Sequence, residues 1–178
     1  MAIEFCIGKL DSSKELKILM DYLSKTMLDE KYGYPKVGDW LMKSEFEIDL
    51  GYKKAWVFWK NERIVSNFLY QKHKEFSNFL EIKNIRTVEE YKRRLLSAFL
   101  WSQIEHEESK NYDAAIVDTR SSNLEMKSLL LHLGFKPIGE NFLYDNKNPD
   151  TIFIKPFNKK TDVGIICKSR EFFLGSES

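Results

Sequence analysis

The chain has 178 residues, of which 43% are hydrophobic and 31% are charged, and its formal net charge is +1. This length suits one domain with a substantial core, and the composition is that of a folded chain rather than a disordered one. So small a net charge favours neither nucleic acid nor an anionic membrane as a partner. No apolar run reaches the length of a secretory signal or a membrane span, so we expect a cytoplasmic protein that is not bound to membranes.

The cysteines and histidines are scattered along the chain. Cys6 and Cys167 lie near opposite ends of the sequence, without the spacing of a zinc site. We therefore expect no bound metal and two reduced thiols. A disulfide is the alternative if the two ends of the chain meet.

The first elements are predicted to be a short strand and a long helix. Residues 3–7 are rich in apolar side chains and end at a glycine, which is typical of a short strand. Ser12 and Glu15 form a capping box at the start of a helix that we expect to end near Asp29. The apolar stripe of this helix recurs every three or four residues, at Leu16, Leu19, Met20, Leu23 and Met27.

The middle of the chain is predicted to be mainly strands. After a helical turn at residues 37–42, residues 45–50 alternate between polar and apolar, which favours a half-exposed strand. Residues 55–59 and 64–70 are β-rich runs joined by a polar turn, which predicts an antiparallel hairpin. A third strand is expected at residues 79–86, although polar and apolar side chains mix on both of its faces.

A long helix and a buried strand follow. The buried face of the helix is predicted from apolar residues at helical spacing, namely Leu95, Leu96, Phe99, Leu100 and Ile104. Residues 114–117 form an uncharged run between Asp113 and Asp118. Such a run indicates a strand that is buried on both faces.

The last part of the domain is predicted to be a helix and the final strands. Ser122 and Glu125 form another capping box, and the apolar helix that follows ends at Gly134. The final strands are expected at residues 135–138, 142–144 and 151–155, with a turn at 146–149. We expect one domain over residues 1–156, followed by a C-terminal extension of residues 157–178.

The element order predicts a mixed α/β domain in which helices flank a central, mostly antiparallel twisted sheet of about six to seven strands. Two stretches are distinctive. In residues 88–100 a strand passes into the long helix, and residues 123–135 form a helix that begins at Asn123 and closes on Leu-Gly-Phe. This pairing resembles the GNAT-type, acetyl-CoA-dependent N-acetyltransferase superfamily over about residues 3–156, and residues 152–156 look like that family's last strand.

The resemblance implies a phosphate-binding turn before the long helix, where unpaired backbone amides and the helix dipole attract pyrophosphate. The family's pattern is Arg or Gln, two residues, Gly, one residue, then Gly or Ala, and it aligns here with residues 92–97. Leu95 stands where the family has its first glycine. The residues implied to bind acetyl-CoA are Arg86, Thr87, Val88, Lys92, Arg93, Arg94, Leu95, Leu96, Ser97, Ala98 and Asn123.

Each part of this predicted cofactor site has a structural alternative. The cations of residues 92–94 reach phosphates with their side chains, or they pair with Glu89 and Glu90. Thr87 and Glu90 form a further capping box, which would start the helix early and bury the turn inside it. Asn123 is equally suited to capping its own helix.

The resemblance implies that the enzyme mainly aligns an amine beside an already activated thioester, removes a proton and stabilises the oxyanion with backbone donors. Glu81 looks like the family's general-base glutamate, and the strand pattern puts it on one face with Lys83, Ile85 and Thr87. The alternatives for Glu81 are an ion pair with Lys83 or a simply solvated position on the strand.

The family's usual general acid is a tyrosine at the position of Leu130, which cannot donate a proton. Tyr144 is the candidate substitute, with Tyr91 as a second choice, unless the thiolate leaves unaided. By the same resemblance, residues 32–49 and 142–150 are expected to build the acceptor pocket.

The expected function is transfer of an acetyl group from acetyl-CoA to a primary amine of a small-molecule or peptide acceptor by direct attack. The alternative is a GNAT-like domain that has lost catalysis and serves as a binding or assembly module. A homodimer through the last strands is compatible with either hypothesis.

Overall fold

The computed structural model describes residues 5–27 and 34–157. They form a seven-stranded sheet in the order β1-β2-β3-β4-β5-β7-β6. The strands are β1 (Phe5–Lys9), β2 (Lys53–Lys60), β3 (Arg63–Lys72), β4 (Phe79–Thr87), β5 (Ala114–Arg120), β6 (Lys136–Asn141) and β7 (Asp150–Pro156). The helices are α1 (Ser13–Met27), α2 (Val37–Asp49), the 3-10 turn η1 (Glu89–Tyr91), α3 (Leu96–Glu108) and α4 (Leu124–His132).

The sheet is antiparallel except where β4 meets β5. These two parallel strands pair only at their starts, from Phe79 opposite Ala114 to Glu81 opposite Ile116. Beyond Glu81 and Ile116 the two strands no longer pair with each other, although β4 stays paired with β3 as far as Thr87 and β5 stays paired with β7 as far as Arg120. The sheet is therefore split along its middle, and the two halves diverge toward the carboxyl ends of β4 and β5.

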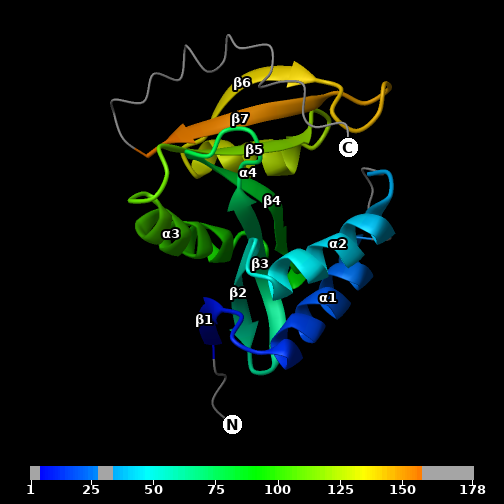
Figure 1. The fold of residues 1–178 in the computed structure, drawn as a ribbon, viewed down its shortest axis with the longest axis vertical. Coiled ribbons are helices and arrows are strands. Elements are labelled where there is room, and N and C mark those ends of the chain that lie inside the picture. The colour runs from blue at the N-terminus through cyan, green and yellow to red at the C-terminus, as the bar shows by residue number, and fades with distance from the viewer. Residues whose placement is uncertain (1–4, 28–33, 158–178) are drawn as a thin grey trace.

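Helices cover both faces of this split sheet (Figure 1). The helices α1 and α2 lie together on one side of β2, β3 and β4, and α3 lies on the other side. The helix α4 packs beside β5 and contributes Leu130 and Leu133 to the same core as α3. The mixed α/β fold with a mostly antiparallel central sheet is confirmed.

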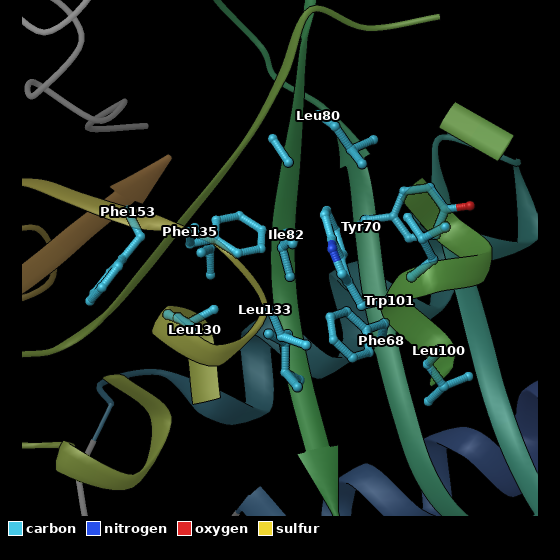
Figure 2. Packing of buried hydrophobic residues seen from close by; sticks show 14 residues of the cluster. Phe68, Tyr70, Leu80, Ile82, Leu100, Trp101, Leu130, Leu133, Phe135 and Phe153 are labelled. Atoms are coloured by element: carbon cyan, nitrogen blue, oxygen red, sulfur yellow. The ribbon is translucent and has the colours of Figure 1, made fainter. Parts of the chain in front are cut away.

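One large core joins the two halves of the sheet. Trp101 of α3 is 2% exposed, and its ring centroid lies 6.2 Å from that of Phe68 on β3 and 4.9 Å from that of Phe135, just before β6. In Figure 2, Leu130, Phe135 and Phe153 lie to one side of Ile82, with Phe68, Tyr70 and Trp101 to the other. Trp101 thus contacts side chains from both halves of the split sheet.

Two predicted strands are wrong. Residues 45–49 belong to the helix α2 and Leu50 is its C-cap, and the inner face of the helix is Leu41, Ser44 and the half-buried Ile48 at helical spacing. The sequence alternates here because Phe46 is apolar, but Phe46 is 64% exposed and so does not mark a buried face. Residues 142–144 lie in the loop between β6 and β7 and form no strand.

The helix boundaries also required corrections. Helix α3 begins at Leu96, so Leu95 precedes it, and Phe99 faces solvent at 60% exposure instead of lining the buried face. Asn123, not Ser122, caps α4, because its side chain accepts a hydrogen bond from the Met126 amide. Gly134 ends that helix at φ 88°, the left-handed conformation that favours glycine there.

Some predictions fall outside the described residues. These are the start of the first strand, residues 28 and 29 of the first helix, Cys167 and almost all of the C-terminal extension. Among the described residues, no helix is long and apolar enough to span a membrane.

Candidate functional site

A β-bulge on β4 marks the point where the sheet splits. Across β3 and β4, Leu69 pairs with Asn84 and Tyr70 pairs with Ile82, so Lys83 is the extra residue of the bulge. The bulge explains why Ile82 and Ile85, three residues apart, share one core. The prediction that Glu81, Ile85 and Thr87 share one face is therefore wrong, because the bulge reverses the alternation after Lys83.

A cavity of about 590 Å³ opens where β4 and β5 diverge. Its walls are residues 82–86 of β4 and 117–119 of β5, and it is closed by the start of α2, by α4 and by the loop that carries Tyr144. Both segments expected to build an acceptor pocket reach this cavity, through residues 34–43 and through Leu143 and Tyr144. A volume of this size is typical of a small-molecule site.

Glu81 is held in an ion pair beside the cavity. One of its carboxylate oxygens lies 2.8 Å from Lys83 Nζ, and the other accepts a hydrogen bond of 2.9 Å from Gln71 Nε2. Burial alone would raise the pKa of Glu81, but the Lys83 charge and these hydrogen bonds outweigh it and lower the pKa. The structural alternative considered for Glu81, a pair with Lys83, is thus what the structure shows.

Asp118 of β5 is a second carboxylate, and it lines the cavity. Its Oδ2 accepts a hydrogen bond of 2.9 Å from the hydroxyl of Tyr144. Burial raises the pKa of Asp118, and the Lys83 charge and the Tyr144 hydroxyl offset this only in part. Burial of the hydroxyl and the adjacent Asp118 charge raise the pKa of Tyr144 well above its usual value, although the residue as a whole is 42% exposed.

Tyr144 is positioned by a buried arginine. Arg120 is 1% exposed and donates to Asp145 Oδ2 at 2.6 Å and to Asp150 Oδ2 at 3.0 Å. Its guanidinium also lies 4.7 Å from the ring centroid of Tyr34 and 5.5 Å from that of Tyr144. Arg120 therefore ties the β6–β7 loop, which carries Tyr144, to β5, which carries Asp118.

The predicted phosphate turn contains no glycine, yet two of its residues have the left-handed backbone conformation that favours glycine. Leu95, at the expected glycine position, has φ 62°, and Arg93 has φ 60°. The first helical hydrogen bond of α3 runs from Phe99 N–H to the Leu95 carbonyl, so the amides of residues 96–98 precede the helical ladder. The early helix start that Thr87 and Glu90 suggested is not found.

The left-handed conformation of Leu95 predicts a measurable strain. A residue with a β-carbon costs about 1–2 kcal/mol in this conformation, and glycine removes that strain. Glycine also makes the unfolded chain more flexible, which offsets about 0.4–1 kcal/mol of the gain. We expect Leu95→Gly to raise the free energy of unfolding by about 0.5–1 kcal/mol, since the Leu95 side chain is 58% exposed and loses little packing. Urea denaturation measures the change.

Leu96→Gly is the matched control, because Leu96 is the first residue of the helix α3. It should lower the free energy of unfolding by about 0.5–1 kcal/mol. Equal losses in both variants would show that the Leu95 backbone carries no strain.

Two of the three cations of the turn, Lys92 and Arg94, have different surroundings. Lys92 Nζ lies 2.8 Å from a carboxylate oxygen of Glu89 and 3.0 Å from one of Glu125 at the start of α4. The Arg94 guanidinium lies 5.4 Å from the ring centroid of Tyr91. Lys92 therefore takes the structural alternative of ion pairing, with Glu125 rather than Glu90 as the second partner.

The residues just before the turn connect the end of β4 to three neighbouring elements, α3, β3 and α1. The Thr87 hydroxyl lies 2.8 Å from that of Ser66 and 2.9 Å from that of Ser97. The Val88 amide donates to the Val65 carbonyl, so it is engaged with β3. Arg86 lines the cavity and donates to the Thr26 carbonyl of α1 at 2.8 Å. Together these contacts fix the distance between the cavity and the start of α3.

The remaining predicted residues are placed as follows. Asn123 caps α4, which is its structural alternative, and it also lines the cavity. Leu130 is fully buried, and Tyr91 is 6% exposed with its hydroxyl bonded to Lys60 Nζ, away from the residues that line the cavity. Of the two tyrosines considered as acids, only Tyr144 reaches the cavity.

Sequence reasoning missed Asp118 and the bulge. Asp118 was read only as the boundary of a buried strand. The bulge had a visible signal, since polar and apolar residues mixed on both faces of residues 79–86, and Ile82 and Ile85 are spaced for a shared face only if one residue is extra.

Comparison with solved structures shows that the domain has the GNAT-type acetyltransferase fold. A putative GNAT-family acetyltransferase from Desulfovibrio desulfuricans is similar to it with a TM-score of 0.73 and 8% identity, over 87% of this chain and 100% of that one. A putative acetyltransferase from Salmonella typhimurium, solved with its cofactor acetyl-CoA, is similar with a TM-score of 0.68 and 13% identity, over 88% and 96% of the two chains.

An aminoglycoside 6'-N-acetyltransferase complexed with coenzyme A is also similar, with a TM-score of 0.69 and 15% identity over 88% of this chain and 99% of that one. No protein-family model and no curated protein sequence matches the chain. Identities this low show the fold, and the chemistry has to be argued from the residues of this chain.

Proposed function

We propose that this protein is an acetyl-CoA-dependent N-acetyltransferase that moves an acetyl group to a primary amine by direct attack. The observation that carries the proposal is that two features follow each other along the chain. Residues 82–86 of β4 line a cavity at the split of the sheet, and the helix α3 begins shortly after them, behind the left-handed residue Leu95. Solved relatives of this fold hold acetyl-CoA or coenzyme A, which supports acetyl-CoA as the co-substrate.

In this proposal the amides of residues 96–98 receive the pyrophosphate, and the arm of the cofactor lies between the diverging strands. The acetyl carbonyl is then placed against the bulge of β4, where the backbone of Lys83 leaves the regular ladder with β3. A backbone donor at that point would stabilise the oxyanion of the tetrahedral intermediate. Tyr144 is the proposed proton donor to the departing sulfur, and Glu81 is the base that the sequence favours.

Calorimetric titration with acetyl-CoA tests the proposal. We expect a dissociation constant between about 1 μM and 1 mM, the range in which enzymes commonly hold their substrates. The double variant Arg93→Glu/Arg94→Glu should weaken binding by about tenfold or more, because it places anions beside the pyrophosphate. Lys72→Glu, at the opposite end of β3, is the charge-reversal control and should bind as the wild type does.

The alternative, a GNAT-like binding or assembly module without catalysis, is favoured by one observation. The cation Lys92 is already paired with Glu89 and Glu125, and the second of these carboxylates approaches the turn from α4. If no heat of binding appears at millimolar acetyl-CoA, the enzyme proposal fails and this alternative stands.

A further inference from the structure

The two carboxylates near the cavity have unlike surroundings. Both oxygens of Glu81 are already engaged, one by Lys83 and one by Gln71. Asp118 lines the cavity itself and accepts a hydrogen bond from a hydroxyl that faces the same space. A carboxylate has about four lone-pair sites, so Asp118 can accept an ammonium proton without losing Tyr144.

We infer that Asp118, and not Glu81, receives the ammonium group of the acceptor and takes its proton, with Tyr144 as the next member of the relay. This inference rests on the proposed acetyl transfer and names the residue that handles the proton in it. Glu81 then has a positioning role, since its ion pair holds the Lys83 side chain at the bulge.

The proton affinities support this division of roles. Burial pushes the pKa of Asp118 upward, while the Lys83 charge keeps the pKa of Glu81 below its usual value. A general base works best when its pKa approaches the operating pH. Two neighbouring carboxylates whose surroundings move their pKa values apart commonly have separate roles.

The proton and electron movements balance as follows. An alkylammonium gives one proton to the Asp118 carboxylate, and the freed nitrogen lone pair forms the C–N bond at the thioester carbon. The C–S bond then breaks with its electron pair on sulfur. The sulfur takes a proton from the Tyr144 hydroxyl, Asp118 restores that proton, and the nitrogen releases its second proton to solvent.

Two probe amines separate base catalysis from every other role of Asp118. Butylamine is an alkylamine whose pKa resembles that of lysine, about 10.4, so it must lose a proton before it attacks. Hydroxylamine is already unprotonated at neutral pH and needs no base for its first step. Each is supplied with acetyl-CoA, and release of the coenzyme A thiol is followed at pH 7.5.

We expect Asp118→Asn to lower butylamine turnover by about a hundredfold or more and to lower hydroxylamine turnover far less. Glu81→Gln is the matched carboxylate-to-amide control on the neighbouring strand, and it should lower butylamine turnover much less than Asp118→Asn. Calorimetry with acetyl-CoA verifies that each variant still folds and binds the cofactor.

Three results would overturn the inference. The first is butylamine turnover that survives Asp118→Asn or is lost in Glu81→Gln instead, and the second is an equal loss of both amines in Asp118→Asn. The third is a wild-type protein that binds acetyl-CoA and acetylates neither amine. Failure of the wild type to bind acetyl-CoA at all is a separate outcome, because it removes the proposed function itself.

Discussion

Arg120→Met is expected to lower the free energy of unfolding by about 3–5 kcal/mol, because it leaves a buried carboxylate without its cation. Asp150 is 0% exposed and lies 3.0 Å from the Arg120 guanidinium. Burial raises the pKa of Asp150 to about 6 even with the arginine present. Without the arginine, Asp150 must either stay charged while buried beside the other carboxylates Asp118 and Asp145 or bind a proton, and both cost stability. Urea denaturation at pH 7 measures the loss.

Two further variants separate the charge pair from the loss of arginine as such. The double variant Arg120→Met/Asp150→Asn removes both charges and should recover most of the stability, to within about 2 kcal/mol of the wild type. Arg63→Met changes an exposed arginine at the start of β3 and should stay within about 0.5 kcal/mol. A double variant as unstable as the single one would show that pairing with Asp150 does not account for the stability that Arg120 provides.

Trp101→Ala should cost about 3–5 kcal/mol, the usual loss when a large buried aromatic side chain is removed. Its ring contacts Phe68 in one half of the split sheet and Phe135 in the other, and Lys155 Nζ of β7 lies 5.2 Å from its centroid. Since β4 and β5 are paired over only a few residues, side chains of α3 replace the missing backbone bonds between the two halves. Thermal or urea unfolding gives the value.

Phe99→Ala is the control on the same helix, because Phe99 is 60% exposed, and it should change stability by no more than about 0.5 kcal/mol. Trp101→Ala should also weaken acetyl-CoA binding, since α3 carries the phosphate turn at its start. A loss below about 1 kcal/mol would contradict the role of Trp101 as the link between the two halves.

Local patterns predicted most of the fold. The hairpin of β2 and β3 was readable because its strands are rich in β-branched and aromatic residues and its turn is polar. The helix α4 was readable because a capping pattern precedes it and Gly134 follows it, although its cap is Asn123 and not the predicted Ser122. The error over residues 45–50 had a tertiary cause, since the apolar side chains of Met42 and Phe46 on α2, and of Leu50 just after it, are exposed.

The site was less predictable, because it depends on where strands part and not on which residues form them. The phosphate turn was located by its motif, yet only the structure shows Leu95 in the conformation of a glycine. The role argued for Asp118 needs β4, β5 and the loop of Tyr144 in one place. Glu81 matched a family pattern, but the pairing of both its oxygens depends on Gln71 from another strand.

We propose that acetyl-CoA lies along the split of the sheet, and a crystal structure of the complex would show directly where it binds. The predicted result has pyrophosphate oxygens within hydrogen-bonding distance of the amides of residues 96–98 and the acetyl group in the cavity between Lys83 and Asp118. A complex with acetyl-CoA bound elsewhere, and with this turn and cavity empty, would rule out this binding mode.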